Sequence, residues 1–318
     1  MNKKVGIIVG IALVGVIGIA SFLGGKGNKE TSSQKEVIAI EHALGSTEVE
    51  SEPKKVVVFD YAMLDAMDTL GIKGVVGTPQ DSAIPEYLSE YKGEEYANIG
   101  GLKEPNLEKI NELDPDLIII NGRQHSFYDK LSEIAPTISM AKEDGKYMES
   151  FSKNMDIIGE LFNKEDLVKK ELGSIKEKIE EINKIVNENE YKASTIMVSD
   201  GNLSVFGADS RFGLIYTDLG FKSTDDNIET ANHGQDVSFE YLASQDADFM
   251  FVIDKSVISG DNNQKAARDI LNNELINKTN AFKNDNIIYL DTHAWYLSDG
   301  GIVSTNKMLE EIKSAIKK

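Results

Sequence analysis

Arginine is rare in this chain, and its few copies are the side chains best suited to binding an oxygen-rich anion. Of the 34 basic residues only Arg123, Arg211 and Arg268 are arginine. The planar guanidinium offers several donors in a fixed arrangement, which suits a flat anion. Arg123 follows a predicted strand and Arg211 follows the turn "GADS", so each could contact a ligand or form an internal salt bridge. Arg268 lies in a polar predicted helix and is expected on the surface.

The four histidines and the absence of cysteine limit the metal chemistry. Without cysteine there are no disulfides, thiolate metal sites, cysteine nucleophiles or lipid attachment through an N-terminal cysteine. His233, between an Asn and a Gly in "NHG", would ordinarily serve a turn or a helix cap. His125 and His293 are expected to lie behind any ligand contacts or to face solvent, and His42 lies in the early strand region without an evident partner.

Charge excludes one large class of partner. The chain of 318 residues carries a formal net charge of −19 with an apolar fraction of 41%, which is typical of an acidic globular protein. Such a charge repels nucleic acid and anionic lipid. We therefore expect no nucleic-acid partner, and any anionic ligand must be captured by a local basic pocket.

The N-terminus predicts export. "MNKK" precedes a run of 19 residues without a charge, long enough to span a bilayer. Residues 1–23 are predicted to be a membrane anchor or a signal peptide, which could be cleaved after Ala20, and residues 24–36 have the composition of a flexible linker. Either outcome places the rest of the chain outside the cytoplasm.

Strands and helices alternate on both sides of one long helical stretch. Apolar runs such as "VVVF" (56–59) and "FMFVID" (249–254) read as buried strands, and amphipathic segments such as 61–71 read as helices. This alternation predicts an α/β fold with parallel sheets. Residues 163–190 predict one long charged helix that joins two Rossmann-like lobes, over 37–162 and 191–318.

A segment of the first lobe recurs in the second at a constant offset. Residues 106–123 and 238–255 align without gaps, so that Glu108 falls on Glu240 and Arg123 on Lys255. Ligands of open parallel sheets bind beyond the carboxyl ends of the strands, which places Arg123 and Lys255 at a crevice between the lobes. The two glutamates begin matching helices, where the helix dipole alone would favour a carboxylate.

Known catalytic motifs give little support for an enzyme. The P-loop, zinc-protease, nucleophile-elbow and dinucleotide-binding patterns are absent. The pattern S-x-x-K occurs four times, as a lysine-rich chain allows, without its usual companion motifs. A cell-surface hydrolase therefore stays only as an alternative that rests on export and the α/β fold.

From about residue 37 to its end, the chain resembles the class III (cluster A) substrate-binding proteins of ABC importers. The similarity is greatest to members that bind ferric catecholate siderophores, including petrobactin. The segments that carry it are "PNLEKI…DPDLIII", "RFGLIYTDLGF", "NHGQDVSFEYL", "VIDKSVISG" and "IIYLDTHAWYL". The resemblance implies a monomeric receptor on the outer face of the membrane, in a Gram-positive bacterium, although the lipid-modified cysteine usual in such relatives is missing.

The resemblance also implies a role for each candidate residue. Arg123, Arg211 and Lys255 would contact an Fe(III)-siderophore, which is the transported ligand and not an intrinsic cofactor. His233 and Tyr296 would complete the six ligands of Fe(III) when the siderophore supplies only four. Glu108 and Glu240 would dock on an ABC permease dimer. Haem or cobalamin is the alternative ligand, but several basic residues around one pocket suit an anionic catecholate better.

Overall fold

The computed structural model describes residues 36–231, 233–259 and 265–317. The predicted anchor over 1–23 and the predicted linker, apart from residue 36, lie outside the described residues. Among the helices of the described ranges, none is both long and apolar enough to cross a membrane.

The first sheet is wholly parallel. Its strands lie in the order β5-β4-β3-β6-β7, with bounds Ala97–Asn98, Val75–Thr78, Val56–Val58, Leu117–Ile120 and Thr137–Ser139. The chain order reverses between β3 and β6, which is where a ligand crevice is expected in such sheets. The segments that connect these strands contain α1 (Tyr61–Thr69), η1 (Glu86–Lys92), α2 (Leu107–Leu113), η2 (Gly122–Phe127) and α3 (Tyr128–Ser132).

The second sheet is mixed. Its path is β11-β9-β8-β12-β13, with bounds Gln235–Val237, Asn202–Phe206, Lys192–Ser199, Phe249–Asp254 and Ile287–Leu290, and β10 (Lys222–Ser223) also pairs with β8. Strands β8, β10, β12 and β13 are parallel, whereas β9 runs antiparallel to β8 and to β11. This departure from the predicted parallel sheet arises at Asp200 and Gly201, whose φ of 51° and 82° form a two-residue hairpin turn.

Short helices complete the second half, and a hairpin opens the described chain. The short helices are η3 (Leu214–Asp218, a π-helical turn), α6 (Phe239–Gln245), α7 (Ser256–Ser259), α8 (Ala267–Leu271), η4 (Ile276–Lys278), α9 (Asn280–Lys283) and η5 (His293–Leu297, also π-helical). The strand region predicted around His42 is the antiparallel pair β1 (Val37–His42) and β2 (Gly45–Glu50), which forms a separate two-stranded sheet. The pairing of these two strands was not predicted.

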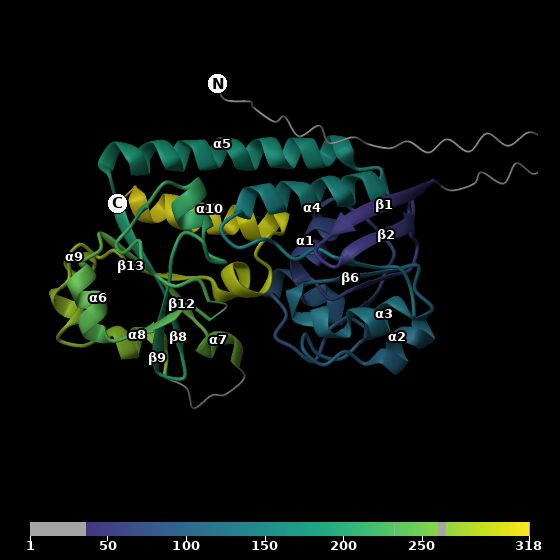
Figure 1. Ribbon diagram of the computed structural model, residues 1–318, viewed down its shortest axis with the longest axis horizontal. Helices are drawn as coiled ribbons and strands as arrows, with labels where there is room; N and C mark the ends of the chain where they lie inside the picture. The colour runs from purple at the N-terminus through teal and green to yellow at the C-terminus, as the bar shows by residue number, and fades with distance from the viewer. Residues whose placement is uncertain (1–35, 232, 260–264, 318) are drawn as a thin grey trace, which may run out of the picture. The chain divides into compact units, whose positions relative to one another are not determined.

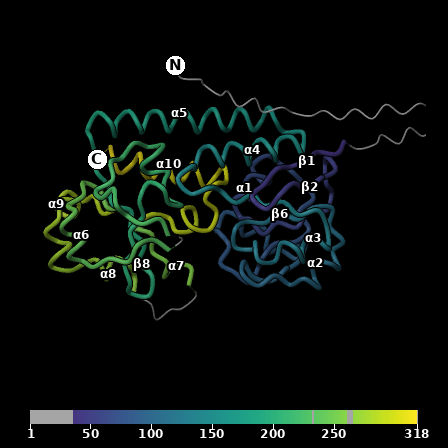
Figure 2. The backbone as a smooth tube through the Cα atoms, viewed as in Figure 1, coloured from purple at the N-terminus to yellow at the C-terminus, as the bar shows by residue number. Residues whose placement is uncertain are grey.

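Three long helices connect the halves. Helix α4 (Tyr147–Phe162) is followed by α5 (Glu165–Asn189), which contacts both α4 and α10 (Ile302–Ile316), each along a different part of its length (Figure 1). The C-terminal helix α10 also packs on α1 of the first half, and Figure 2 shows its yellow trace between α5 and the sheets. The exact lobe boundaries, 37–162 and 191–318, stay a prediction.

The alternation of side chains along each strand explains the layers. In β6, Leu117 and Ile119 belong to one large core, while Ile118 and Ile120 belong to another under α2 and α3. In β12 the alternation repeats: Phe249, Phe251 and Ile253 join the large core, and Met250 and Val252 pack under α6, α8 and α9. Because both faces of each sheet are covered, the strands read as continuous apolar runs. The large core includes α1, α4, α5 and α10, so it spans both halves.

Candidate ligand-binding site

Arg123 is held at the carboxyl end of β6 by the cap of a short helix. Asn121 follows the strand, and its side chain accepts a hydrogen bond from the Gly122 N–H at 2.6 Å. The Gln124 side chain in turn accepts a hydrogen bond from the Asn121 N–H at 3.0 Å. The Asn121 amide also donates to the buried Asp60 carboxylate at 2.8 Å. Burial raises the pKa of Asp60, which follows β3 at the same sheet edge. The site therefore begins at the carboxyl ends of β3 and β6, where ligands of open parallel sheets are expected to bind.

Lys255 occupies the matching place in the second half, directly after β12. Its ammonium lies 5.6 Å from the centre of the Tyr296 ring, and the Arg123 Cζ lies 5.6 Å from the same centre. The prediction that the two residues of the repeated segments face one crevice agrees with this geometry. Among the residues that the structure describes, neither Arg123 nor Lys255 has a carboxylate within salt-bridge distance.

Arg211 reaches the same place from a different loop. Ser210 closes the turn after β9 by donating to the Gly207 carbonyl at 2.7 Å, and Arg211 follows it. Its Cζ lies 4.2 Å from the centre of the Tyr296 ring, a cation–π distance. Its Nε is buried without a hydrogen-bond partner in the described part of the chain. Buried donors without partners are rare, so this one is suited to an acceptor on a ligand.

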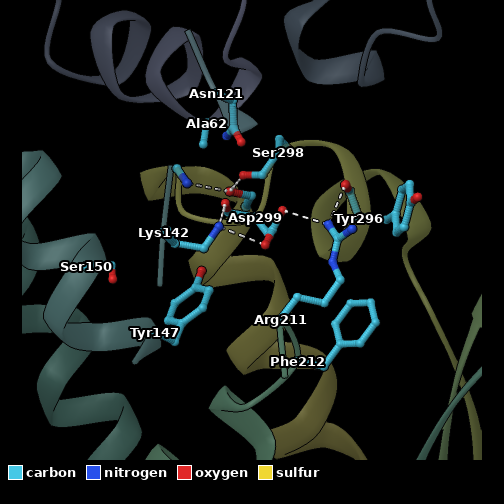
Figure 3. Close-up of polar contacts among 12 residues, drawn as sticks. Ala62, Asn121, Lys142, Tyr147, Ser150, Arg211, Phe212, Tyr296, Ser298 and Asp299 are labelled. Atoms are coloured by element: carbon cyan, nitrogen blue, oxygen red, sulfur yellow. Dashed lines mark hydrogen bonds and ion pairs between the residues drawn. The ribbon is translucent and has the colours of Figure 1, made fainter. Parts of the chain in front are cut away.

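Tyr296 is the point on which the three cations converge. It lies in η5, after β13, and its carbonyl oxygen accepts hydrogen bonds from Arg123 at 2.9 Å and from Arg211 at 3.1 Å (Figure 3 shows the latter). Its ring is half-buried beside Lys255 and both guanidinium groups. One residue of the second half thus orders cations from both halves.

Two cavities meet at Arg123 and Tyr296. The larger, about 890 Å³, also contains Lys255 together with apolar residues of α7 and acids and lysines of the first half. The smaller, about 500 Å³, contains Arg211, His233, His125 and Lys142. Both volumes lie in the range of small-molecule sites. The five residues predicted for ligand binding therefore line one or both of two adjoining cavities.

His233 and Tyr296 share the smaller cavity, where His233 is exposed in a turn before β11. His125 lines the same cavity and bonds Ser139 through its Nε2 at 2.8 Å, and burial lowers its pKa. His293 is half-buried, and its Nδ1 lies 3.7 Å from the Asp291 Oδ1. His42 pairs with Thr47 at 2.9 Å in the first hairpin.

Trp295 lies in the core, and Arg268 lies on the surface as the sequence predicts. The Trp295 ring is fully buried and donates to Glu311 at 2.8 Å, so it packs within the core rather than against a ligand. Arg268 is exposed in α8 and lies 4.3 Å from the centre of the Tyr289 ring.

Sequence reasoning missed Lys142 and Asp299, which form a largely buried ion pair beside Arg211. The Lys142 ammonium lies 2.8 Å from the Asp299 carboxylate and 2.5 Å from its carbonyl oxygen. Lys142 comes shortly after β7 ends at Ser139. The expectation that ligands bind beyond the carboxyl ends of parallel strands, which led to Arg123, could therefore also have identified Lys142. Asp299 lies in the "SDGG" segment after Tyr296, where a local pattern gives no sign of a distant lysine.

The matched glutamates occupy equivalent exposed positions. Glu108 is in the first turn of α2 and Glu240 in the first turn of α6, capped by Asn106 and Ser238 respectively. Both helices end in an Asp with left-handed φ, of 48° at Asp114 and 44° at Asp246. Residues 106–123 and 238–255, which align at an offset of 132 residues (240 − 108), therefore also match in structure.

The link from the site to α10 is built from buried polar groups. Asp65 of α1 accepts hydrogen bonds from the Val303 and Ser304 N–H groups at 2.8 and 2.9 Å, at the start of α10. Tyr87 bonds both Asp65, at 3.0 Å, and Ser298, at 2.8 Å. Burial raises the pKa of Asp65. These contacts tie the segment after Tyr296 to the first half.

Comparison with known proteins matches the chain to binding proteins for iron complexes. It is 41% identical to the petrobactin-binding protein YclQ of Bacillus subtilis, over 97% of this chain and 98% of that protein. The crystal structure of YclQ superimposes with a TM-score of 0.85 at 42% identity, covering 89% of this chain and 100% of the other. The periplasmic catecholate-siderophore binding protein VctP of Vibrio cholerae gives 0.83 at 35% identity, covering 88% and 100%.

The family model described as periplasmic binding protein matches residues 56–294, from β3 into η5. This stretch includes both sheets, the long helix and the loops that carry Arg123, Arg211 and Lys255. The family and these relatives are binding proteins and not enzymes, so the hydrolase alternative has no support. The predicted two-lobed α/β fold with one long helix is confirmed by the solved structures. The chain belongs to the periplasmic binding protein family.

Proposed function

We propose that this protein captures an Fe(III)-catecholate siderophore between its two halves and delivers it to an ABC permease for iron uptake. The convergence of Arg123, Arg211 and Lys255 on Tyr296 carries the proposal. Ferric catecholates are planar-armed, oxygen-rich anions, and guanidinium groups with unused donors suit them. The names of the relatives, a petrobactin binder and a catecholate-siderophore binder, support the same ligand class.

Iron itself would be ligated by the protein only when the siderophore leaves positions open. Fe(III) is a hard ion that accepts phenolate oxygen and imidazole nitrogen, and a siderophore with two catechol arms fills four of its six positions. Tyr296 and His233 line the same cavity and offer these two donor types. A siderophore with three arms would use the cations alone.

Outside the cleft, Glu108 and Glu240 would dock on the two halves of a permease dimer. Their matched, exposed positions on α2 and α6 suit a partner that presents the same surface twice. The protein would act as a monomer, tethered through its N-terminal segment to the outer face of a Gram-positive cell membrane. Replacing both glutamates with Gln should leave siderophore binding intact and reduce uptake by cells; unchanged uptake would exclude this docking role.

Fluorescence titration tests the ligand assignment directly. Trp295 is the single tryptophan and precedes Tyr296, so a ferric catecholate in the cleft should quench its emission. We expect saturable quenching by a ferric bis-catecholate with Kd from nanomolar to below about 1 μM, and weaker or no response to haem and cobalamin. Tighter binding of haem or cobalamin, or no binding of the ferric catecholate by any readout, would overturn the proposal.

The denticity argument has its own test. Changing His233 to Ala should weaken a tetradentate ferric complex by about tenfold or more and leave a hexadentate complex nearly unaffected. His125→Ala, in the same cavity but bonded to Ser139, is the matched control. Equal losses for both complexes in the His233 variant would defeat iron ligation while leaving the charge pocket in place.

A further inference from the structure

Three carboxylates line the smaller cavity, and Asp299 is the buried one among them, whereas Glu143 and Asp144 are exposed. Lys142 approaches it from one side at 2.8 Å and Arg211 from the other at 3.6 Å (Figure 3). Lys142 follows β7 in the first half, whereas Arg211 follows β9 in the second. Asp299 therefore joins cations from both halves immediately beside the predicted ligand contacts, and all three residues line the smaller cavity.

The local sequence builds this arrangement. Gly300 has a φ of +104°, and a Cβ there would lie 3.1 Å from the Lys142 Cδ. A side chain at this position would both strain the backbone and displace Lys142. On the other side of Asp299, the Ser298 Oγ lies within hydrogen-bond distance of the Tyr87 hydroxyl oxygen, at 2.8 Å. The segment "SDGG" thus holds the Asp299 carboxylate in place between its two cations.

Because Asp299 is largely buried, its negative charge contributes strongly to the electrostatic potential of the cavity. The side chains of Lys142 and Asp299 are 14% and 11% exposed, and that of Arg211 is 23% exposed. Solvent screens such charges less than it screens those at the surface. Because Lys142 donates to both the carboxylate and the carbonyl of Asp299, its charge is offset before any ligand arrives. Asp299 also repels an anionic ligand that Arg211 attracts.

We propose that Asp299 is a specificity-determining counter-ion, which lowers the positive charge of the cavity so that it favours ferric complexes of low negative charge over those of high negative charge. The inference rests on the proposed function and deepens it. A ferric bis-catecholate carries one negative charge and a ferric tris-catecholate carries three. Coulomb energy is proportional to ligand charge, so a resident carboxylate penalises the second complex three times as strongly.

A charge-removing isostere tests the proposal. Asp299→Asn should raise the affinity for a ferric bis-catecholate about twofold and for a ferric tris-catecholate about eightfold, since the second factor is the cube of the first. The probes are synthetic bis- and tris-catecholates loaded with Fe(III), titrated by Trp295 emission. Glu180→Gln, an exposed site on α5, makes the same change in net charge and should leave the ratio of the two affinities unchanged.

A double variant separates charge from positioning. Lys142→Met alone should lower the affinity for the tris-catecholate more than for the bis-catecholate, and adding it to Asp299→Asn should return the ratio toward that of the wild type. If Asp299 only positions Arg211, the Asp299→Asn variant should lose affinity for both complexes and the double variant should not recover. Equal changes for both complexes would overturn the proposal. If the wild type binds neither complex, the proposed function itself fails, and this inference fails with it.

Discussion

Arg123 and Arg211 donate to the same backbone oxygen, the carbonyl of Tyr296, at 2.9 and 3.1 Å. The two guanidinium groups come from different halves of the protein and would repel one another without this shared acceptor and the nearby Asp299. Their separation is therefore set before a ligand binds, and an anion that bridges them relieves the remaining repulsion. Binding sites organised in this way lose little entropy when the ligand arrives.

Removal of either arginine should reduce affinity without unfolding the protein. Arg123→Ala and Arg211→Ala should each weaken a ferric catecholate about 10- to 100-fold, the usual effect of losing a hydrogen bond from a charged group. Lysine should restore only part of the loss, because it lacks the planar array of donors. Arg268→Ala on the exposed face of α8 is the control. Full affinity in both lysine variants would show that charge alone suffices.

Asp65→Ala should destabilise the whole fold. It removes the acceptor of two buried N–H groups at the start of α10 and of the Tyr87 hydroxyl. We expect a loss of about 2–4 kcal/mol in the free energy of unfolding, measured in urea, because these donors would remain without partners. Asp68→Ala, on the same helix but exposed, loses the hydrogen bond from the Tyr91 hydroxyl at 3.0 Å and should cost much less. Equal losses would indicate that the contacts to α10 contribute little.

The repeated segments should respond alike to loss of their helix caps. Asn106 accepts the Lys109 N–H at 3.0 Å and Ser238 accepts the Tyr241 N–H at 3.3 Å. Replacing either with Ala should lower the free energy of unfolding by about 1 kcal/mol. Asn111→Ala, at an exposed position inside α2, should change it by less than about 0.5 kcal/mol. A large difference between the two cap variants would argue against equivalence of the repeats.

Acid should weaken the hydrogen bonds and ion pairs that join α5 to the C-terminal helix α10. Glu181 accepts hydrogen bonds from Lys313 at 2.6 Å and Lys317 at 2.9 Å, and these bonds lower its pKa from 4.5 to about 2. Since the folded pKa is the lower one, the stabilisation is present above pH 4.5 and is lost as the pH falls toward 2. Glu181→Gln should therefore unfold at lower urea than the wild type at pH 7.

The difference in urea midpoint between the wild type and Glu181→Gln should shrink progressively below pH 4.5. Urea unfolding curves of both proteins at pH 7, 5, 4 and 3 would measure this decrease. Glu177→Gln, at an exposed position one turn earlier in α5, should match the wild type at every pH. A gap between wild type and Glu181→Gln that stays constant with pH would show that the charge of Glu181 is not the cause.

Local patterns predicted most of the architecture, because burial on both faces makes parallel strands into continuous apolar runs and amphipathic helices show their period. The strand ends led to Arg123 and Lys255, and the recurrence of residues 106–123 as 238–255 led to Glu108 and Glu240. The hairpin between β8 and β9 could also have been foreseen from "DG" at Asp200 and Gly201. Its apolar flanking strands fit a parallel sheet equally well, so alternation alone did not decide their direction.

The sequence by itself determined which residues end at the edges of the sheets, since chain order, strand period and residue type are all local properties. Only the tertiary structure decided which of those edges meet. The shared Tyr296 carbonyl, the Lys142–Asp299 pair and the attachment of α10 to Asp65 each join residues more than a hundred positions apart or loops from different halves. Such pairings depend on how the large core packs α1, α4, α5 and α10 together, and no short-range pattern encodes that packing.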